Sequence, residues 1–271
     1  EMSASLVGSE MCIRDRHYGR EKRIVYQKLE ENGGISVNTN AAAELAKGEY
    51  LMFCDHDDTL EPDALYEIVK AINDTDADVV YTDEDKVSMD GQHYFDPNFK
   101  PDFNLFRLRE NNYICHIFVV RKSLTDETGM LRSEFDGAQD FDFILRCCEK
   151  AKKITHIPKV LYHWRCHMDS TAADPSSKAY AYEAGRKAIR EHYQRMGIDA
   201  KVDMTERPGW YRSHIKVQGN PMVSIIIPNK DHIEDLKRCM DSIDKKSTYQ
   251  NYEYIIVAVS YTHLRAHETS A

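Results

Sequence analysis

Three carboxylates within four residues could do chemistry in this chain, because Asp55, Asp57 and Asp58 directly follow the apolar run 50–54. Carboxylates this close repel one another unless a cation compensates their charge. Their oxygens suit Mg²⁺ or Mn²⁺, which bind few protein carboxylates and leave coordination positions for a diphosphate. The alternative without chemistry is a polar turn that caps the next helix. The density of charge favours a metal site.

Asp140 is the candidate general base. It opens the helical pattern 139–150, where backbone dipoles at the helix N-terminus stabilise an ionised carboxylate. A carboxylate in that state is a competent proton acceptor. The alternative is a simple N-terminal helix cap. Asp142, two residues later, is expected to face solvent or Arg146.

Further candidates stand near the ends of later predicted strands. Asp83, Glu84 and Asp85 could bind the polar groups of a ligand, or could form a solvated acidic turn. Trp164 could stack on a ligand or belong to the core. His116 stands in an alternating strand pattern and is expected to be structural.

Short apolar runs alternate with helical patterns, which predicts an α/β fold with a doubly wound, mostly parallel sheet. Ligands of such sheets bind at the carboxyl ends of the strands, where residues 55–58 would lie. The helix that follows is expected to open at Pro62, with Leu65, Ile68, Val69 and Ile72 at helical spacing. The predicted strands are 50–54, 78–82, 113–120, 154–157, 160–165, 223–228 and 252–257. The other predicted helices are 38–47, 139–150, 177–196 and 234–243.

The domain organisation is predicted from both ends inward. The formal net charge of −9 over 271 residues argues against nucleic-acid binding. Residues 1–16 and 259–271 resemble translated sequencing-adapter DNA and are left out of the fold prediction. The remainder is predicted to hold an incomplete α/β domain over 17–204, a linker over 205–221 and the start of a second such domain over 222–258. The cysteine spacing favours reduced thiols over a zinc site or disulfides.

Two enzyme classes carry an Asp-x-Asp at a strand end. The chain resembles haloacid-dehalogenase-type phosphatases in one respect: Asp55 would be the nucleophile, Asp57 the general acid, and Thr82 would end the second strand. Asp58 stands where those enzymes have glycine. Those enzymes also carry a pair of acidic metal ligands late in the chain, after a helix that bears a lysine. This sequence has no clear pair of that kind, so the resemblance is incomplete.

The order of motifs across residues 23–198 is similar to that of family 2 glycosyltransferases of GT-A fold, especially those that build bacterial surface polysaccharides. Residues 221–256 resemble the opening of a second such domain, as in tandem members of the family. The resemblance also implies that the first strand–helix–strand of the first domain is missing, so the chain is expected to bind donor poorly. Residues 222–258 could fill that place as in a circular permutant. The motifs are ENGGIS at 31–36, DHDD at 55–58, YTDEDK at 81–86, FKPD at 99–102, GAQDFD at 137–142 and LYHWRCH at 161–167.

The resemblance implies a role for each candidate. Asp57 would bind the metal, Asp55 would face the nucleoside or the water shell of the metal, and His167 would complete that shell. Asp140 would be the base, while Gln139 stands where the family has a second acidic residue. The residues expected near the donor are Asn32, Gly33, Asn40 and Asp55, and those expected near the donor or acceptor sugar are Asp83, Glu84, Asp85 and Trp164.

The implied reaction moves a sugar from a nucleoside-diphosphate sugar to a growing polysaccharide or polyprenyl-linked glycan. It would invert the anomeric centre and use Mg²⁺ or Mn²⁺. The implied location is the cytoplasmic face of a bacterial plasma membrane, with peripheral association and no nucleic-acid partner. The missing acidic residue at Gln139 leaves one further alternative, a module that binds glycan or nucleotide without turnover.

Overall fold

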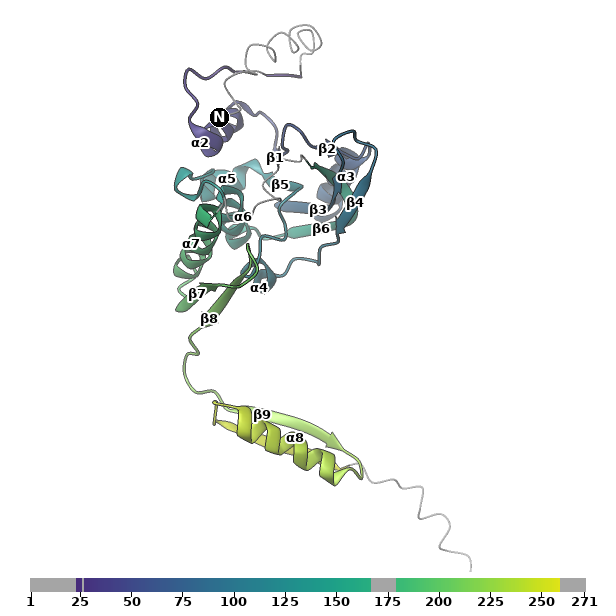
Figure 1. Ribbon diagram of the computed structural model, residues 1–271, viewed down its shortest axis with the longest axis vertical. Coiled ribbons are helices and arrows are strands. Elements are labelled where there is room, and N and C mark those ends of the chain that lie inside the picture. The colour runs from purple at the N-terminus through teal and green to yellow at the C-terminus, as the bar shows by residue number, and fades with distance from the viewer. Residues whose placement is uncertain (1–22, 26, 167–178, 259–271) are drawn as a thin grey trace, which may run out of the picture. The chain divides into compact units, whose positions relative to one another are not determined.

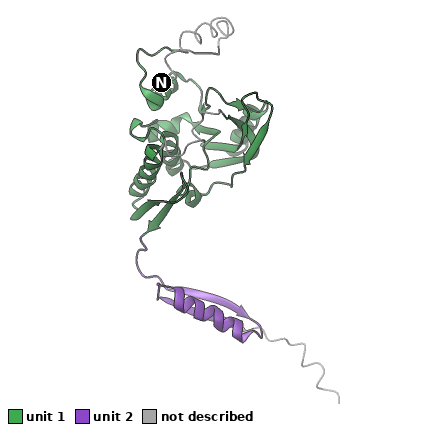
Figure 2. Ribbon diagram, in the orientation of Figure 1, with its two compact units in different colours: residues 1–215 green, residues 216–271 purple. Residues whose placement is uncertain are grey.

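The computed structural model describes residues 23–25, 27–166 and 179–258. The chain divides between Ile215 and Lys216 into two compact units (Figure 2). No helix in the described part of the chain is long and apolar enough to cross a membrane.

A six-stranded sheet forms the centre of the first unit (Figure 1). β3 and β6 pair in parallel, and β1 points the same way because β5 lies antiparallel between β1 and β3. β2 and β4 are antiparallel to their neighbours β6 and β3. The predicted α/β fold is confirmed, and residues 55–58 follow the carboxyl end of β1. The strands in sheet order are β1 (Tyr50–Phe53), β5 (Phe118–Arg121), β3 (Val79–Val87), β6 (Ile154–Arg165) and β2 (Thr59–Leu60), with β4 (Tyr94–Asn98) beside β3.

Helices cover both faces of this sheet, because successive side chains of β3 point to opposite faces. Val79 and Tyr81 belong to a core shared with α6 (Gln139–Lys150) and α7 (Ala179–Arg195). Val80 belongs to a second core shared with α3 (Ala64–Thr75). The shorter helices of this unit are α2 (Gly34–Leu45), α4 (Leu105–Leu108), α5 (Lys122–Thr128) and the 3₁₀ turn η1 (Ser133–Phe135).

Two helices show what the apolar and charged patterns of the sequence become in the fold. In α3, Ile68 is buried, but Leu65 and Val69 are 60% and 54% exposed. The apolar spacing is therefore wider than the buried stripe, because the sheet covers only the stripe that contains Ile68. In α6, Asp142 is buried and pairs with Arg146 at 2.9 Å, which is one of its two expected environments.

A β-hairpin lies where a linker was expected. β7 (Ala200–Met204) and β8 (Tyr211–Ile215) pair antiparallel, and the first unit runs to Ile215. Gly209, at φ +75°, belongs to the turn between them. The Pro- and Gly-bearing stretch therefore marks a turn at this point, and the expected start of the linker at residue 205 is wrong.

The second unit contains β9 (Val223–Asn229), α8 (Ile233–Lys246) and β10 (Tyr252–Ala258). β9 and β10 pair in parallel as a separate two-stranded sheet, and α8 buries none of its residues. The circular-permutant hypothesis stays a prediction.

Candidate active site

The loop after β1 is tied to β6 by its last carboxylate. The Tyr162 hydroxyl donates to Asp58 Oδ2, and the backbone N–H of Arg165 donates to Asp58 Oδ1 at 2.8 Å. Burial raises the pKa of Asp58, and both hydrogen bonds oppose that rise. Asp58 holds the loop in place and does not cap α3, whose N-cap is Asp63. The helix-capping alternative is therefore wrong for Asp58.

Asp55 and Asp57 are the more exposed carboxylates of this loop, with side chains 55% and 34% exposed. Asp55 Oδ2 lies 3.7 Å from His116 Nε2. The backbone N–H of Asp55 donates to the Tyr162 hydroxyl at 3.2 Å, and the carbonyl of Asp57 accepts from Arg165 Nε at 2.7 Å. The backbone of the loop is thus fixed from β6, while Asp55 lies beside His116 and Asp57 Oδ1 lies 3.7 Å from His56 Nδ1.

Asp140 lies in the first turn of α6, as predicted. Asn112 Nδ2 donates to Asp140 Oδ2 at 2.8 Å. Burial raises the pKa of Asp140, while the charge of His116, the backbone N–H groups of Phe141 and Asp140, and the Asn112 amide lower it. Burial prevails, so the pKa of Asp140 lies above that of an ordinary aspartate. Such a carboxylate is a stronger base than one in water.

Asp55 and Asp140 border the same short segment before β5. Burial raises the pKa of the Cys115 thiol well above its usual value, and the charges of Glu84, Asp140 and Asp55 raise it further. The next residue, His116, contacts Asp55 and acts on the pKa of Asp140. Asn112 joins Asp140 to this segment, because its Nδ2 donates to Asp140 at 2.8 Å and its Oδ1 accepts from the backbone N–H of Cys115 at 3.4 Å. Two carboxylates that are far apart in sequence therefore border the segment 112–116.

A buried ion pair holds this segment. Lys100 Nζ donates to Glu84 Oε2 at 3.1 Å, to the Ile114 carbonyl at 2.7 Å and to the His116 carbonyl. Glu84 Oε2 also accepts from the backbone N–H of His116 at 3.2 Å. The Lys100 side chain is fully buried, and its three protons are all used. The ion pair therefore fixes the backbone on both sides of Cys115.

The acidic cluster 83–85 lies within β3 and not after it, because β3 continues to Val87 beside β4 and β6. Asp83 is buried, accepts from the backbone N–H of Lys100 at 2.9 Å and lies 2.8 Å from His156 Nε2. Asp85 Oδ1 lies 2.6 Å from His163 Nδ1. Sugar contacts by Asp83, Glu84 and Asp85 stay predictions, and the contacts favour a positioning role for the buried pair Asp83 and Glu84.

Three of the residues expected near the donor, Asn32, Gly33 and Asn40, lie just before α2 or within it. Asn40 exchanges two hydrogen bonds with the backbone of Leu131, at 2.8 and 3.0 Å. Asn32 Oδ1 accepts from the backbone N–H of Gly34 at 3.1 Å, and Gly33 is the N-cap of the helix. Both asparagine side chains thus bind protein groups, and their nucleotide contacts stay predictions.

Trp164 lies at the end of β6 and is 41% exposed. Its ring meets the His116 ring edge-on, with centroids 5.8 Å apart, and His116 stacks on Tyr162 at 4.8 Å. Trp164 therefore sits at the rim of the region that contains Asp55, outside the two buried cores. His167 lies outside the described residues, so its predicted metal contact stays a prediction.

Comparison with known proteins places the chain in a family. Residues 12–129 match the model of Glycosyl transferase family 2. The O-antigen biosynthesis protein RfbC of Myxococcus xanthus is 35% identical over 240 residues, which cover 88% of this chain and 19% of RfbC. The chain belongs to glycosyl transferase family 2.

Two further comparisons describe this family 2 chain. The uncharacterized protein y4gI of Sinorhizobium fredii is 44% identical over 267 residues, which cover 92% of this chain and 29% of y4gI. The chain thus spans less than a third of either relative. S. aureus TarS 1–349 in complex with UDP-GlcNAc shares the fold, with a TM-score of 0.52 and 20% identity over 70% of this chain and 55% of that one.

The loop of this family 2 chain offers ligands that fit a hard divalent cation. Asp55 and Asp57 supply carboxylate oxygens, the ligand type that Mg²⁺ and Mn²⁺ prefer. In the described residues, no group of three or more His, Cys, Asp or Glu is arranged to hold a metal by itself. An ion held by one or two carboxylates and by substrate phosphates needs no such group.

Several residues that shape the site were not predicted from sequence. His116 was expected to be structural, yet it contacts Asp55. Lys100 lies within the motif FKPD, and Asn112 opens NYI at 112–114, which is a further short motif of the family resemblance. A motif carries no information about which carboxylate each of them will bind. The signal that could have been used is a lysine in a segment rich in aromatic and proline residues, since a buried lysine requires an acidic partner. The missed residues are Lys100, Asn112, His116, Tyr162 and Arg165.

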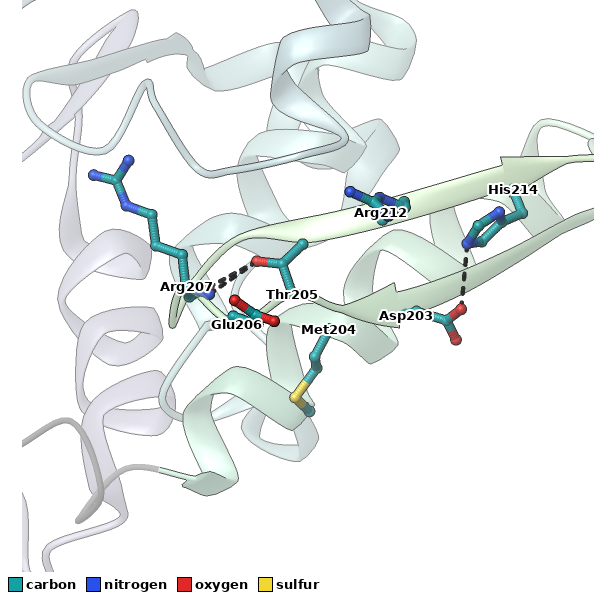
Figure 3. A pocket seen from close by; sticks show the side chains of 7 residues that line it. All are labelled: Asp203, Met204, Thr205, Glu206, Arg207, Arg212 and His214. Atoms are coloured by element: carbon teal, nitrogen blue, oxygen red, sulfur yellow. Dashed lines mark hydrogen bonds and ion pairs between the residues drawn. The ribbon is translucent and has the colours of Figure 1, made fainter. Parts of the chain in front are cut away.

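A hollow of about 570 Å³ lies elsewhere, on the β7–β8 hairpin (Figure 3). Asp203, Arg207, Arg212 and His214 are among its lining residues, and His214 pairs with Asp203 at 3.3 Å. None of the predicted site residues that the structure describes lines it.

Proposed function

We propose that this chain is the catalytic part of an enzyme that moves a sugar from a nucleoside-diphosphate sugar onto a growing bacterial polysaccharide or lipid-linked glycan. The observation that carries the proposal is that one short segment contacts both carboxylates: Asn112 donates to Asp140 at 2.8 Å, and His116 Nε2 lies 3.7 Å from Asp55. Group transfer between two bound substrates requires a carboxylate on the donor side and a base on the acceptor side, held close together. The name of RfbC supports polysaccharide synthesis, and the UDP-GlcNAc complex of TarS supports a nucleotide-sugar donor.

In the proposed reaction, Asp140 accepts the proton of the acceptor hydroxyl. The acceptor oxygen forms a bond to the anomeric carbon of the donor sugar as the bond from that carbon to the diphosphate oxygen breaks. The electron pair of the broken bond leaves with the diphosphate. A single displacement of this kind inverts the anomeric centre. The raised pKa of Asp140 favours proton acceptance, and Asn112 holds the carboxylate in one orientation.

Asp57 and Asp55 would hold Mg²⁺ or Mn²⁺, with His167 as a further candidate ligand. When bound, such an ion neutralises the developing charge of the departing diphosphate. Asp58 and Arg165 keep the loop in the conformation that presents both carboxylates. We also propose that the enzyme works at the cytoplasmic face of a bacterial plasma membrane, where lipid-linked acceptors would be available.

The test is release of nucleoside diphosphate from a panel of sugar nucleotides, with Mg²⁺ or Mn²⁺ and with EDTA. It uses the longest natural protein that contains residues 17–258. We expect metal-dependent release that falls by at least about 100-fold in both Asp57→Ala and Asp140→Asn. Asp63→Asn is the matched control, because Asp63 lies at the start of α3 and makes no side-chain capping bond.

The other outcomes separate the alternatives. Hydrolysis of simple phosphate esters that is lost in Asp55→Ala would instead identify a phosphatase, a class to which the family match gives no support. Absence of both activities would indicate a binding module. The Gln139 side chain accepts from the Gly137 N–H at 2.8 Å, so a Gln139→Glu variant tests whether the missing acidic residue limits turnover.

A further inference from the structure

A row of three side chains crosses one face of the sheet beside the candidate active site. Lys86 in β3 pairs with Trp164 in β6 on one side and with Phe95 in β4 on the other. Directly paired residues of neighbouring strands point to the same face of a sheet. The adjacent residues confirm this assignment, since Tyr94 packs against His163, 4.6 Å between centroids, on the opposite face. Figure 1 shows β4, β3 and β6 side by side.

Both rings of this row are open to solvent. Trp164 is 41% exposed and Phe95 is 45% exposed. The Lys86 ammonium between them pairs with Asp96, and the pair is partly exposed. Exposed aromatic faces next to charged and hydrogen-bonding groups fit carbohydrate, because a sugar offers an apolar C–H face and a polar rim of hydroxyls.

The row continues into the candidate active site. The Trp164 ring meets His116 edge-on at 5.8 Å, and His116 lies 3.7 Å from Asp55. Adjacent strands lie about 4.8 Å apart, so Phe95 and Trp164, separated by β3, are roughly 10 Å apart. One sugar ring cannot cover both residues. An occupant of the whole row must therefore be an oligosaccharide, which excludes the single sugar of the donor.

We propose that Trp164, Lys86 and Phe95 form a subsite for the acceptor glycan, a role that rests on the proposed function. The sugars behind the reacting end of the chain would stack on Trp164 and then on Phe95. The ammonium of Lys86 would hydrogen-bond to hydroxyl or carboxylate groups between them. Phe95 is the specificity-determining residue of this subsite, because it is the contact that short acceptors do not reach.

The test measures glycan binding without turnover. The chain has two tryptophans, Trp164 and Trp210, so a Trp210→Phe background makes Trp164 the reporter. The probes are neutral, amino-sugar and uronic-acid oligosaccharides of one to eight sugars. We expect at least one class to change the Trp164 emission, with affinity that rises from the monosaccharide to three or more sugars.

Variants in the Trp210→Phe background then isolate the row. Phe95→Ala should weaken binding of the longer oligosaccharides by about five- to tenfold and leave monosaccharide binding unchanged. Phe95→Tyr should retain the affinity. Tyr94→Ala is the matched control, because this neighbour is also exposed but faces the other side of the sheet. Circular dichroism checks that each variant folds.

Two results would overturn the subsite: no oligosaccharide changes the emission, or Phe95→Ala binds long oligosaccharides as tightly as its parent. The proposed function fails separately. Glycan binding without any nucleoside-diphosphate release would leave the subsite standing and remove the transferase. The opposite result is turnover of a sugar nucleotide in which Phe95→Ala leaves the KM for a long acceptor unchanged. That result would support the transferase and overturn the subsite.

Discussion

At the scale of single residues, neighbours decide which carboxylates of this chain can act on a ligand. Asp58 is bound by Tyr162 and Arg165, while Asp55 is more than half exposed in the same loop. The surroundings of Asp140 decide its role too, because burial raises its pKa although four polar groups beside the carboxylate lower it. Residue type alone does not separate these roles.

Loss of the Asn112 amide should move the acid limb of the activity profile. This amide stabilises the ionised form of Asp140, so Asn112→Ala should raise the pKa of Asp140 further. The proposed base must be ionised to act, and activity should therefore decline at a higher pH than in the parent as the medium is acidified. The measurement is kcat/KM against pH. An unchanged acid limb in Asn112→Ala would show that Asp140 is not the group that titrates.

The raised pKa of Asp140 favours proton acceptance in the proposed reaction, but it lowers the stability of the fold at neutral pH. Between the ordinary aspartate pKa and the raised one, the folded chain binds more protons at Asp140 than the unfolded chain does, so stability falls as pH rises through that window. Asp140→Asn should then increase the free energy of unfolding at pH 7 by about 1 kcal/mol while it abolishes transfer. Urea unfolding at pH 7 and at pH 3.5 checks this. The gain should vanish at the lower pH, and a loss of stability at pH 7 would contradict the assignment.

At the scale of elements, the segment between α4 and β5 depends on one buried ion pair. Lys100→Met should lower the free energy of unfolding by about 3–5 kcal/mol, because Glu84 would remain buried and charged without its partner. The double variant Lys100→Met with Glu84→Met should recover much of that loss. Lys86→Met is the control, since the partly exposed Lys86–Asp96 pair should contribute less than about 1 kcal/mol. Denaturant unfolding of the parent, Lys100→Met, Glu84→Met and the double variant gives the coupling energy of the pair. A coupling energy near zero would show that the pair does not stabilise this segment.

Gly137 sets the distance between the start of α6 and the start of α7. A Cβ at Gly137 would lie 2.6 Å from Tyr180 Cε2 and 2.9 Å from Ala181 Cβ, at a backbone φ of +97°. Gly137→Ala should therefore destabilise the fold by about 2–3 kcal/mol, through both crowding and backbone strain. Gly197→Ala is the matched control, because φ is +67° there and no atom lies within 4 Å of the added Cβ. Thermal unfolding that lowers the Tm equally in both variants would show that crowding is unimportant at Gly137.

At the scale of the whole molecule, the two units differ in what they bury. The first unit contains two packed clusters on opposite faces of its sheet. In the second unit, α8 buries none of its residues, and Ile226 of β9 is 70% exposed. A two-stranded sheet with one helix has too little core to fold cooperatively in water.

Expression of the units by themselves tests this difference. Residues 17–215 should unfold in one cooperative transition, with the free energy of unfolding of the longer chain. Residues 216–258 should show no cooperative thermal transition by circular dichroism, because little apolar surface leaves water when they fold. A sharp transition in the shorter piece would mean that the second unit is a domain in its own right.

The sequence by itself determined several of the elements and the positions of the acidic residues along them. Periodicity placed β1 and predicted α6 at its observed bounds, and the order of the residues put 55–58 at the carboxyl end of β1, because these are properties of neighbouring residues. The tertiary structure decided which side chains meet. Asp55, His116 and Asp140 belong to separate elements, and their proximity depends on how the sheet orders β1, β5 and β3 and on the buried Lys100–Glu84 pair. Contacts between distant segments, and the burial that shifts a pKa, depend on the packing of the whole sheet and have no local sequence signature.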